Sequence, residues 1–205
     1  MTDAPRKRVR LPAPVRAKHL LDAALVEFSE HGFAAARIED IAHRAGLSKS
    51  GVYAHYDSKE AIFEALLEYT MQPAPDAPPP VLDEATTVEA FVDAFIDGCY
   101  RHMADPTVLR MLRLMIAEST RVPELIQRWH HSFVVSFHRT QADTLARAVE
   151  RGLVRASPLT DQFSLAYAPV LYAAITQLTT GQPSLADPAL RDAHARMMLS
   201  LLRAP

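Results

Sequence analysis

The sequence predicts an all-α protein of about nine helices, because apolar residues recur at helical spacing and no segment alternates in the manner of a strand. From Val15 to Glu30 the apolar positions follow the i, i+3, i+4, i+7 pattern of an amphipathic helix. His31-Gly32 is expected to end this helix, since glycine readily adopts the left-handed conformation found at helix C-termini.

Glycines and prolines mark the ends of the other predicted helices. In the N-terminal part we expect helices over about 38–45, 48–56 and 58–71. Residues 72–80 contain five prolines in nine positions, which excludes a helix because proline lacks an amide donor. Beyond them, helices are predicted at about 85–104, 106–120, 123–151, 159–180 and 186–203. Pro169 should kink the fourth of these helices or free one of its carbonyls.

The composition is that of a soluble globular protein, with 49% hydrophobic and 22% charged residues. No apolar stretch approaches the roughly 18 residues that a membrane span needs. The first residues are basic and contain no apolar core of a signal peptide. The single cysteine, Cys99, excludes an internal disulfide and fits a reducing compartment. We therefore expect a cytoplasmic protein that has no membrane partner.

Charge is unevenly distributed along the chain. Residues 1–59 carry ten Lys/Arg against seven Asp/Glu, a balance of +3, and the remainder carries twelve against seventeen, a balance of −5. A basic N-terminal piece on an acidic body suggests that one end meets a polyanion, although small domains also reach such a balance by chance.

The segment Ile38 to Tyr56 has the pattern of a helix-turn-helix. Two short predicted helices are joined by Ala45-Gly46-Leu47, and a turn of three or four residues with a glycine is typical of this motif. Ile38, Ile41 and Ala42 would pack the first helix, while Leu47 and Val52 would anchor the second. The exposed face of the second helix would then be free to enter the DNA major groove.

The stretch from Arg16 to Leu67, about a quarter of the chain, resembles the DNA-binding domain of the TetR family of bacterial transcriptional regulators. The resemblance is carried by Ala24, Phe28, Gly32-Phe33, Ile38, Asp40-Ile41-Ala42, Ala45-Gly46-Leu47-Ser48-Lys49, Val52-Tyr53, His55-Tyr56 and Ser58-Lys59-Glu60. It implies a basic arm at 1–14, a three-helix DNA-binding domain at 15–71, a proline-rich linker at 72–84, and a ligand-binding and dimerisation domain at 85–205. It also implies a ligand-responsive regulator of double-stranded DNA, by family habit a repressor that a small effector releases from its operator.

Eight residues of the predicted DNA-binding surface follow from the motif. Ser48 suits a helix N-cap, Lys49 can donate to guanine O6 or N7, and Ser50 can pair with either kind of base edge. The resemblance places Tyr53 and Lys59 at phosphate-binding positions, although Tyr53 is equally well explained as a core residue. The full expected set is Arg37, Ser48, Lys49, Ser50, Gly51, Tyr53, His55 and Lys59.

One position departs from the family pattern. Many members have Thr or Ser just before the second helix, whereas this chain has Ala36-Arg37, so the N-cap is lost or moved. Arg37 is expected to replace the phosphate contact by its charge. Ahead of the domain, the basic run Arg6-Lys7-Arg8-Val9-Arg10 is either a DNA-contacting arm or a solubilising tail.

The last two predicted helices are expected to form a homodimer interface. The helix at 159–180 is apolar on nearly all sides, so it must be buried on more than one face. Two helices from each subunit would build a four-helix interface with two-fold symmetry. The residues expected there are Phe163, Tyr167, Leu171, Ala174, Leu178, Leu190, His194, Met197 and Leu201.

A pocket for a mainly hydrophobic small molecule is expected among the preceding helices, because methionine adapts to varied apolar ligands. Its candidate residues, which plain core packing would also explain, are Phe95, Cys99, Met103, Met111, Met115, Trp129, Phe133 and Phe137.

Other functional classes receive less support. The sequence lacks the HExxH, CxxC, GxSxG and Gly-rich phosphate patterns, so we expect no enzyme, no catalytic residues, no cofactor and no metal site. Two alternatives stay open: a metal-sensing regulator using His130, His131 and His138, and a helical interaction module that does not bind DNA.

Overall fold

The computed structural model describes residues 13–71 and 85–203, and within these ranges it contains helices and no strands. The all-α prediction is confirmed. Residue contacts divide the chain into two compact units, Met1–Leu67 and Glu68–Pro205. The predicted linker at 72–84, and all but the last two residues of the predicted arm, lie outside the described residues. None of the described helices combines the length and apolar character that crossing a bilayer requires.

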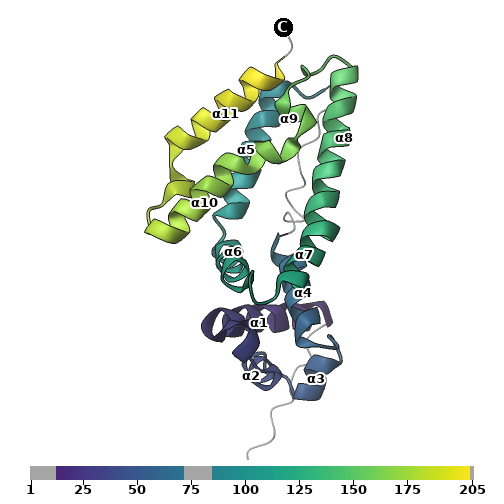
Figure 1. Ribbon diagram of the computed structural model, residues 1–205, viewed down its shortest axis with the longest axis vertical. Helices are drawn as coiled ribbons and strands as arrows, with labels where there is room; N and C mark the ends of the chain where they lie inside the picture. The colour runs from purple at the N-terminus through teal and green to yellow at the C-terminus, as the bar shows by residue number, and fades with distance from the viewer. Residues whose placement is uncertain (1–12, 72–84, 204–205) are drawn as a thin grey trace, which may run out of the picture. The chain divides into compact units, whose positions relative to one another are not determined.

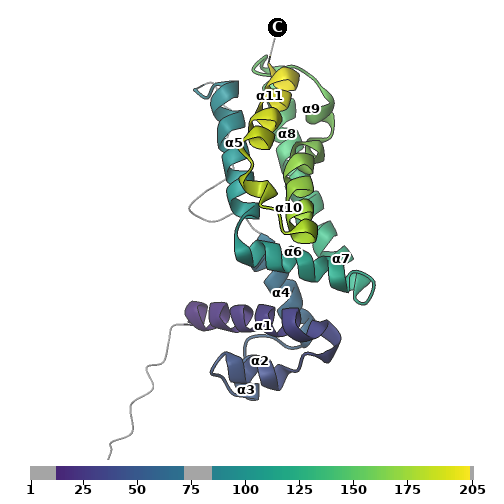
Figure 2. The same cartoon turned by 90° about the vertical axis from the view of Figure 1, so that its left-hand side faces the viewer.

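The first unit is built from α1 (Ala13–Ala35), α2 (Ile38–Arg44), α3 (Lys49–Tyr53) and the start of α4 (Lys59–Met71). Figure 2 shows α2 and α3 side by side, next to α1. Phe28, Phe33 and Phe63 form an aromatic centre, with ring centroids 5.2–5.7 Å apart. Around it, Leu20, Leu25, Ile41, Val52 and Leu66 are almost completely buried. The apolar stripe of the first predicted helix is therefore the core of this unit.

The backbone leaves helical geometry at Gly32, where φ is 76° and ψ is 162°. Helical geometry therefore breaks at Gly32, where the first helix was predicted to end, but α1 continues beyond this residue to Ala35, so the predicted end was too early. A positive φ is readily adopted only by glycine, so this residue determines where the chain turns toward α2.

Helix α3 is shorter than the predicted range of 48–56, because it ends at Tyr53. The backbone amides of His55 and Tyr56 both donate to the carbonyl of Val52, at 2.9 and 3.0 Å. Because two successive amides use the same acceptor, the regular α-helical hydrogen-bond pattern stops here. The chain then turns toward α4. The prediction for the C-terminal end of this helix was wrong.

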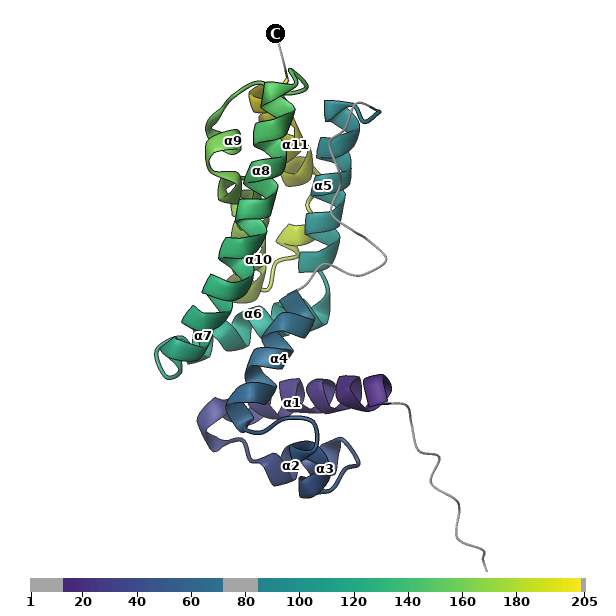
Figure 3. The same ribbon diagram turned by 90° about the vertical axis from the view of Figure 1, so that its right-hand side faces the viewer.

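The second unit contains α5 (Val88–Met103), α6 (Pro106–Glu118), α7 (Pro123–Trp129), α8 (Ser136–Glu150), α9 (Pro158–Asp161), α10 (Ala168–Thr180) and α11 (Pro188–Leu202). Figures 1 and 3 show α5 beside α10 and α11, and these helices form direct contacts. Their core includes Phe95, Ile96, Tyr100, Val170 and Met198.

Two predicted helices are divided into shorter pieces. The range 123–151 contains the π-helix η1 (His130–Val135) between α7 and α8. The range 159–180 consists of α9, the 3-10 helix η2 (Phe163–Tyr167) and α10. Pro169 lies in the first turn of α10, where its missing amide is tolerated. A break therefore replaces the predicted kink.

Candidate nucleic-acid interface

The turn between α2 and α3 is fixed by backbone geometry. Gly46 has φ 68°, and the amide of Leu47 donates to the carbonyl of Ala42 at 2.8 Å. This is the capping pattern expected of a glycine that follows a helix C-terminus. Val52 is completely buried and anchors α3 in the first unit. The two helices of the predicted motif are thus held together by their turn and by this anchor.

Ser48 caps the N-terminus of α3, as the sequence predicted. Its Oγ accepts a hydrogen bond from the amide of Gly51 at 3.1 Å and lies 3.0 Å from the Oγ of Ser50. A Cβ atom at position 51 would lie only 3.3 Å from the Ser48 hydroxyl. The absence of a side chain at Gly51 therefore leaves room for the cap.

The solvent-exposed face of α3 carries three of the predicted DNA-binding side chains, those of Lys49, Ser50 and Tyr53. The side chain of Tyr53 is 44% exposed, so Tyr53 is not a core residue. Arg37, immediately before α2, is also exposed, whereas His55 is half-buried. The ammonium of a lysine and the hydroxyls of a serine and a tyrosine thus lie on one short helix. Such groups can donate hydrogen bonds to phosphates and to base edges.

Lys49 is paired with Glu39, a residue that sequence reasoning missed. The Nζ of Lys49 lies 2.6 Å from Oε1 of Glu39, which belongs to the first turn of α2. The hydrogen bond from Lys49 lowers the pKa of the Glu39 carboxyl, and the same bond raises the pKa of Lys49. Both groups are therefore charged at neutral pH. An acidic residue at a helix N-terminus is common, so the sequence alone carried no signal for this pair.

Lys59 lies in a different environment from Lys49. Its Nζ donates to the backbone carbonyls of Ala34 and Ala36, both at 3.0 Å, and lies 4.8 Å from the ring centroid of Phe33. The predicted phosphate ligand is therefore already bonded to the segment that leads into α2. Two of its three N–H donors are used in this way.

The predicted absence of a side-chain cap at the start of α2 is confirmed. Arg37 occupies the N-cap position with φ −111° and ψ 145°, and its side chain forms no capping hydrogen bond. Within the described residues, Glu39 and Asp40 are the acidic groups of the first turn of this helix.

A surface hollow between α1 and α2 is lined by Glu27, His31, Asp40, His43, Arg44 and Ala35. Glu27, Glu30 and His31 place three potential metal ligands within 4.8 Å of one another. The guanidinium of Arg44, however, lies 3.3 Å from Glu27 and 2.7 Å from Glu30. A protein cation thus already offsets part of the charge of these two carboxylates. Among the described residues, His130, His131 and His138 belong to no such group of ligands.

The predicted pocket residues of the second unit are only partly brought together. Phe95 and Phe137 both contact the ring of Tyr167, with centroids 5.2 and 6.0 Å apart. Cys99 and Met103 pack against the same core. Met111 and Trp129 are buried but are not members of that core, Met115 is half-buried, and the side chain of Phe133 lies outside the described set.

His138 and Tyr167 complete an aromatic cluster that the sequence did not identify as a pocket. Their rings stack at 5.6 Å with an interplanar angle of 28°, and Phe163 packs edge-on against Tyr167 at 5.6 Å. Burial lowers the pKa of His138 and raises that of Tyr167. Burial also raises the pKa of Cys99 to about 12. The polar groups of this cluster are therefore neutral at pH 7.

The predicted interface residues divide into two groups. Phe163, Ala174 and His194 are buried within this chain, at 3%, 0% and 2% exposure, so their side chains are not available to a second subunit. Those three assignments were wrong, because the apolar face that carries them packs inward. Leu171 and Met197 are exposed, while Tyr167, Leu178, Leu190 and Leu201 are half-buried. Exposed Leu165, Tyr172 and Ile175 were not among the predicted residues.

A glycine turn, a capped second helix and an exposed polar face on that helix together define a helix-turn-helix DNA-binding protein. The model of the bacterial regulatory proteins of the tetR family matches residues 20–66, and that of the tetracyclin repressor-like C-terminal domain matches residues 84–193. The second match alone covers more than half of the chain. The chain belongs to the TetR family of transcriptional regulators.

Curated relatives that match this chain are transcriptional regulators. The HTH-type transcriptional repressor SCO4008 of Streptomyces coelicolor is 35% identical over 103 residues, which is 50% of each chain. The HTH-type transcriptional activator FasR of Mycolicibacterium smegmatis is 41% identical over 63 residues, 31% of this chain and 29% of FasR. The match thus spans half or less of the length of these relatives.

Solved structures show the same fold over nearly the whole chain. A TetR family transcriptional regulator from Pseudomonas syringae pv. tomato superposes with a TM-score of 0.72 at 22% identity, covering 95% of this chain and 100% of that one. The fatty acid degradation regulator FadR from Bacillus halodurans gives 0.66 at 18% identity, covering 96% and 100%.

Proposed function

We propose that this regulator is a repressor that binds a near-palindromic operator as a homodimer and is released by a small, mainly hydrophobic effector. The observation that carries the proposal is the exposed face of α3, where Lys49, Ser50 and Tyr53 stand on a helix anchored by Val52. A short helix held in this way can enter the major groove, and the neighbouring Arg37 can contact phosphate.

Dimerisation is supported by an apolar surface on α10. Leu171 and Ile175 lie one helical turn apart and are each 42% exposed, and Tyr172 beside them is 65% exposed. Met197 on α11 is 37% exposed. Large apolar side chains gathered on one helix face are typical of a protein–protein contact. A two-fold pair would present two copies of α3 to successive major grooves about 34–36 Å apart.

The chemistry of the aromatic cluster supports a hydrophobic effector. Phe95, Phe137, Phe163 and Tyr167 pack ring against ring, and His138 is the polar group stacked on Tyr167. Because burial keeps these polar groups neutral, the cluster favours an uncharged or weakly polar molecule over an ion.

Release requires that the effector bind more tightly to a conformation that holds DNA poorly. A coupling free energy of 1–3 kcal/mol, typical of allostery, would change operator affinity about 5- to 150-fold. Repression is favoured over activation by the repressor SCO4008, which matches over the longer segment, although FasR is named an activator.

The proposal is tested by footprinting the purified protein on DNA upstream of its own gene and of the neighbouring genes. We expect protection of a near-palindromic site, and protection that weakens when a hydrophobic compound raises the melting temperature of the protein. A half-site fragment that binds as tightly as the full site would contradict the dimeric arrangement. If the protein protects no duplex in this experiment, a helical interaction module that does not bind DNA would be favoured instead.

A further inference from the structure

We propose that Glu39 is a specificity-determining residue, which holds the ammonium of Lys49 at the start of α3 and so weakens binding to arbitrary DNA more than binding to the preferred sequence. This inference rests on the proposed function, because it concerns how α3 recognises DNA. It assigns a role to an acidic residue on a surface that is otherwise expected to attract a polyanion.

The pair joins the two helices of the helix-turn-helix. Glu39 lies in the first turn of α2 and Lys49 is the first residue of α3, and their charged atoms are 2.6 Å apart. Both side chains are more than half exposed, at 56% and 54%. The carboxylate therefore lies on the same solvent-facing surface as the lysine that is expected to reach DNA.

Glu39 also acts on a second cation of this surface. Besides Lys49, the charge of Arg37 contributes to the lowered pKa of Glu39. One carboxylate thus offsets part of the positive field of two predicted DNA ligands. Exposed ion pairs contribute little to folding stability. The position of this pair is therefore better explained by a role in DNA binding than by a role in folding.

The consequence for recognition follows from the properties of lysine. An unrestrained lysine is a point charge on a flexible stem and binds whichever phosphate it meets. Paired with Glu39, the Lys49 ammonium keeps two of its three donors for another partner, but in a restricted direction. A guanine edge that lies in that direction retains its contact, whereas an arbitrary phosphate loses it and also meets the negative charge of Glu39.

The test compares the full-length parent with Glu39→Gln on two duplexes of about 30 base pairs. One has a random sequence, and the other is selected by the parent from a random library. We expect Glu39→Gln to bind the random duplex about three- to tenfold more tightly, with a salt dependence steeper by about 0.9 in log–log slope. Affinity for the selected duplex should change less than twofold, so the specificity ratio falls.

Asp22→Asn is the matched control, because Asp22 is an exposed acid on α1 and its replacement changes the net charge equally. It should leave the specificity ratio unchanged. In a Lys49→Ala background, Glu39→Gln should lose most of its effect, since the two residues act as a pair. Circular dichroism and the melting temperature verify that each variant is folded.

Glu39→Gln that behaves like Asp22→Asn, or that strengthens binding to both duplexes equally, overturns the inference. A parent that selects no sequence from the library contradicts the proposed function itself. The two failures are therefore distinguishable.

Discussion

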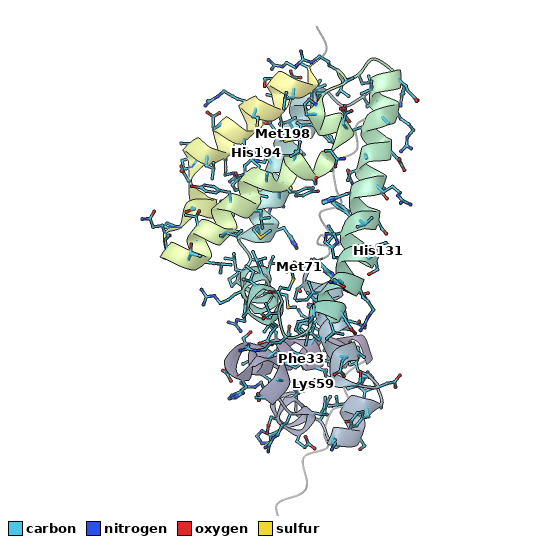
Figure 4. All side chains as sticks on the ribbon, in the orientation of Figure 1. Phe33, Lys59, Met71, His131, His194 and Met198 are labelled. Atoms are coloured by element: carbon cyan, nitrogen blue, oxygen red, sulfur yellow. The ribbon has the colours of Figure 1, made fainter. Side chains whose placement is uncertain are left out.

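The ammonium of Lys59 lies 4.8 Å from the ring centroid of Phe33, at the point where the start of α4 meets the end of α1 (Figure 4). The same Nζ donates to the carbonyls of Ala34 and Ala36. These carbonyls lie directly before α2, so one side chain ties the beginning of α4 to the entry into the helix-turn-helix. Lys59 thus positions the motif, whether or not its remaining donor meets a phosphate.

Lys59→Met should lower the free energy of unfolding by about 1–3 kcal/mol, because it keeps the apolar stem but removes two hydrogen bonds and the cation–π contact. Urea denaturation followed by circular dichroism measures this loss. Lys18→Met, which removes the same charge from the exposed side of α1, should change stability much less. Equal losses in the two variants would show that the Lys59 contacts do not stabilise the fold.

A second prediction concerns the uncapped start of α2. Arg37 has the extended backbone that an N-cap residue requires, but its side chain provides no acceptor. Arg37→Ser should therefore stabilise the protein by about 1 kcal/mol, while weakening DNA binding if Arg37 contacts phosphate. Thermal unfolding and a DNA titration separate the two effects. Arg37→Ala removes the charge without adding a cap, so it should weaken DNA binding without any gain in stability.

The third prediction addresses the apolar surface of α10. Ile175→Glu should convert the homodimer to a monomer, because it would place a charge in a desolvated contact. Light scattering coupled to gel filtration measures the mass. Ile116→Glu on α6 is the control, since Ile116 is 54% exposed but lies outside this surface. A dimer that persists in Ile175→Glu would place the interface elsewhere.

Local features of the fold were predictable from the sequence, whereas contacts between distant segments were not. Gly32 and Gly46 marked the limits of helices because a positive φ is a local requirement, and Ser48 was recognisable as a cap for the same reason. The end of α3 was misjudged because the sequence does not show that the amides of His55 and Tyr56 share the carbonyl of Val52. Likewise, the apolar residues of 159–180 recur at helical spacing, and this periodicity does not show that the chain is divided before α10.

The candidate site shows the same division. The exposed residues of α3 follow from the motif, but the partners of its cations do not. Lys49 meets Glu39 across the turn, and Lys59 meets carbonyls 23 and 25 residues earlier in the chain. His194 was assigned to an outward-facing stripe, yet it is buried beside Tyr100 of α5. A hydrophobic stripe does not reveal whether it faces its own core or another subunit.

The burial of His194 leads to a prediction about pH (Figure 4). Burial lowers the pKa of His194 below the ordinary 6.5, and the nearby backbone of Ala166 offsets only part of this shift. Neither ring nitrogen of His194 forms a well-defined hydrogen bond with the residues that the structure describes. Between the ordinary and the lowered pKa, the unfolded chain binds the proton and the folded chain does not. Stability should therefore be fully present above pH 6.5 and fall as the pH decreases, by up to about 1.4 kcal/mol per pH unit for this one group.

His102 and His138 have pKa values lowered by burial as well, so they add to the same trend. Urea denaturation at several pH values from 7.5 to about 5 measures the trend. His194→Gln should be less stable at every pH, because it disturbs the core, but its stability should depend less on pH than that of the parent. His19→Gln, on the exposed side of α1, should retain the parent's dependence. A His194→Gln curve parallel to that of the parent would mean that His194 does not remain neutral in the folded protein, since only a group that titrates differently in the two states can change the slope.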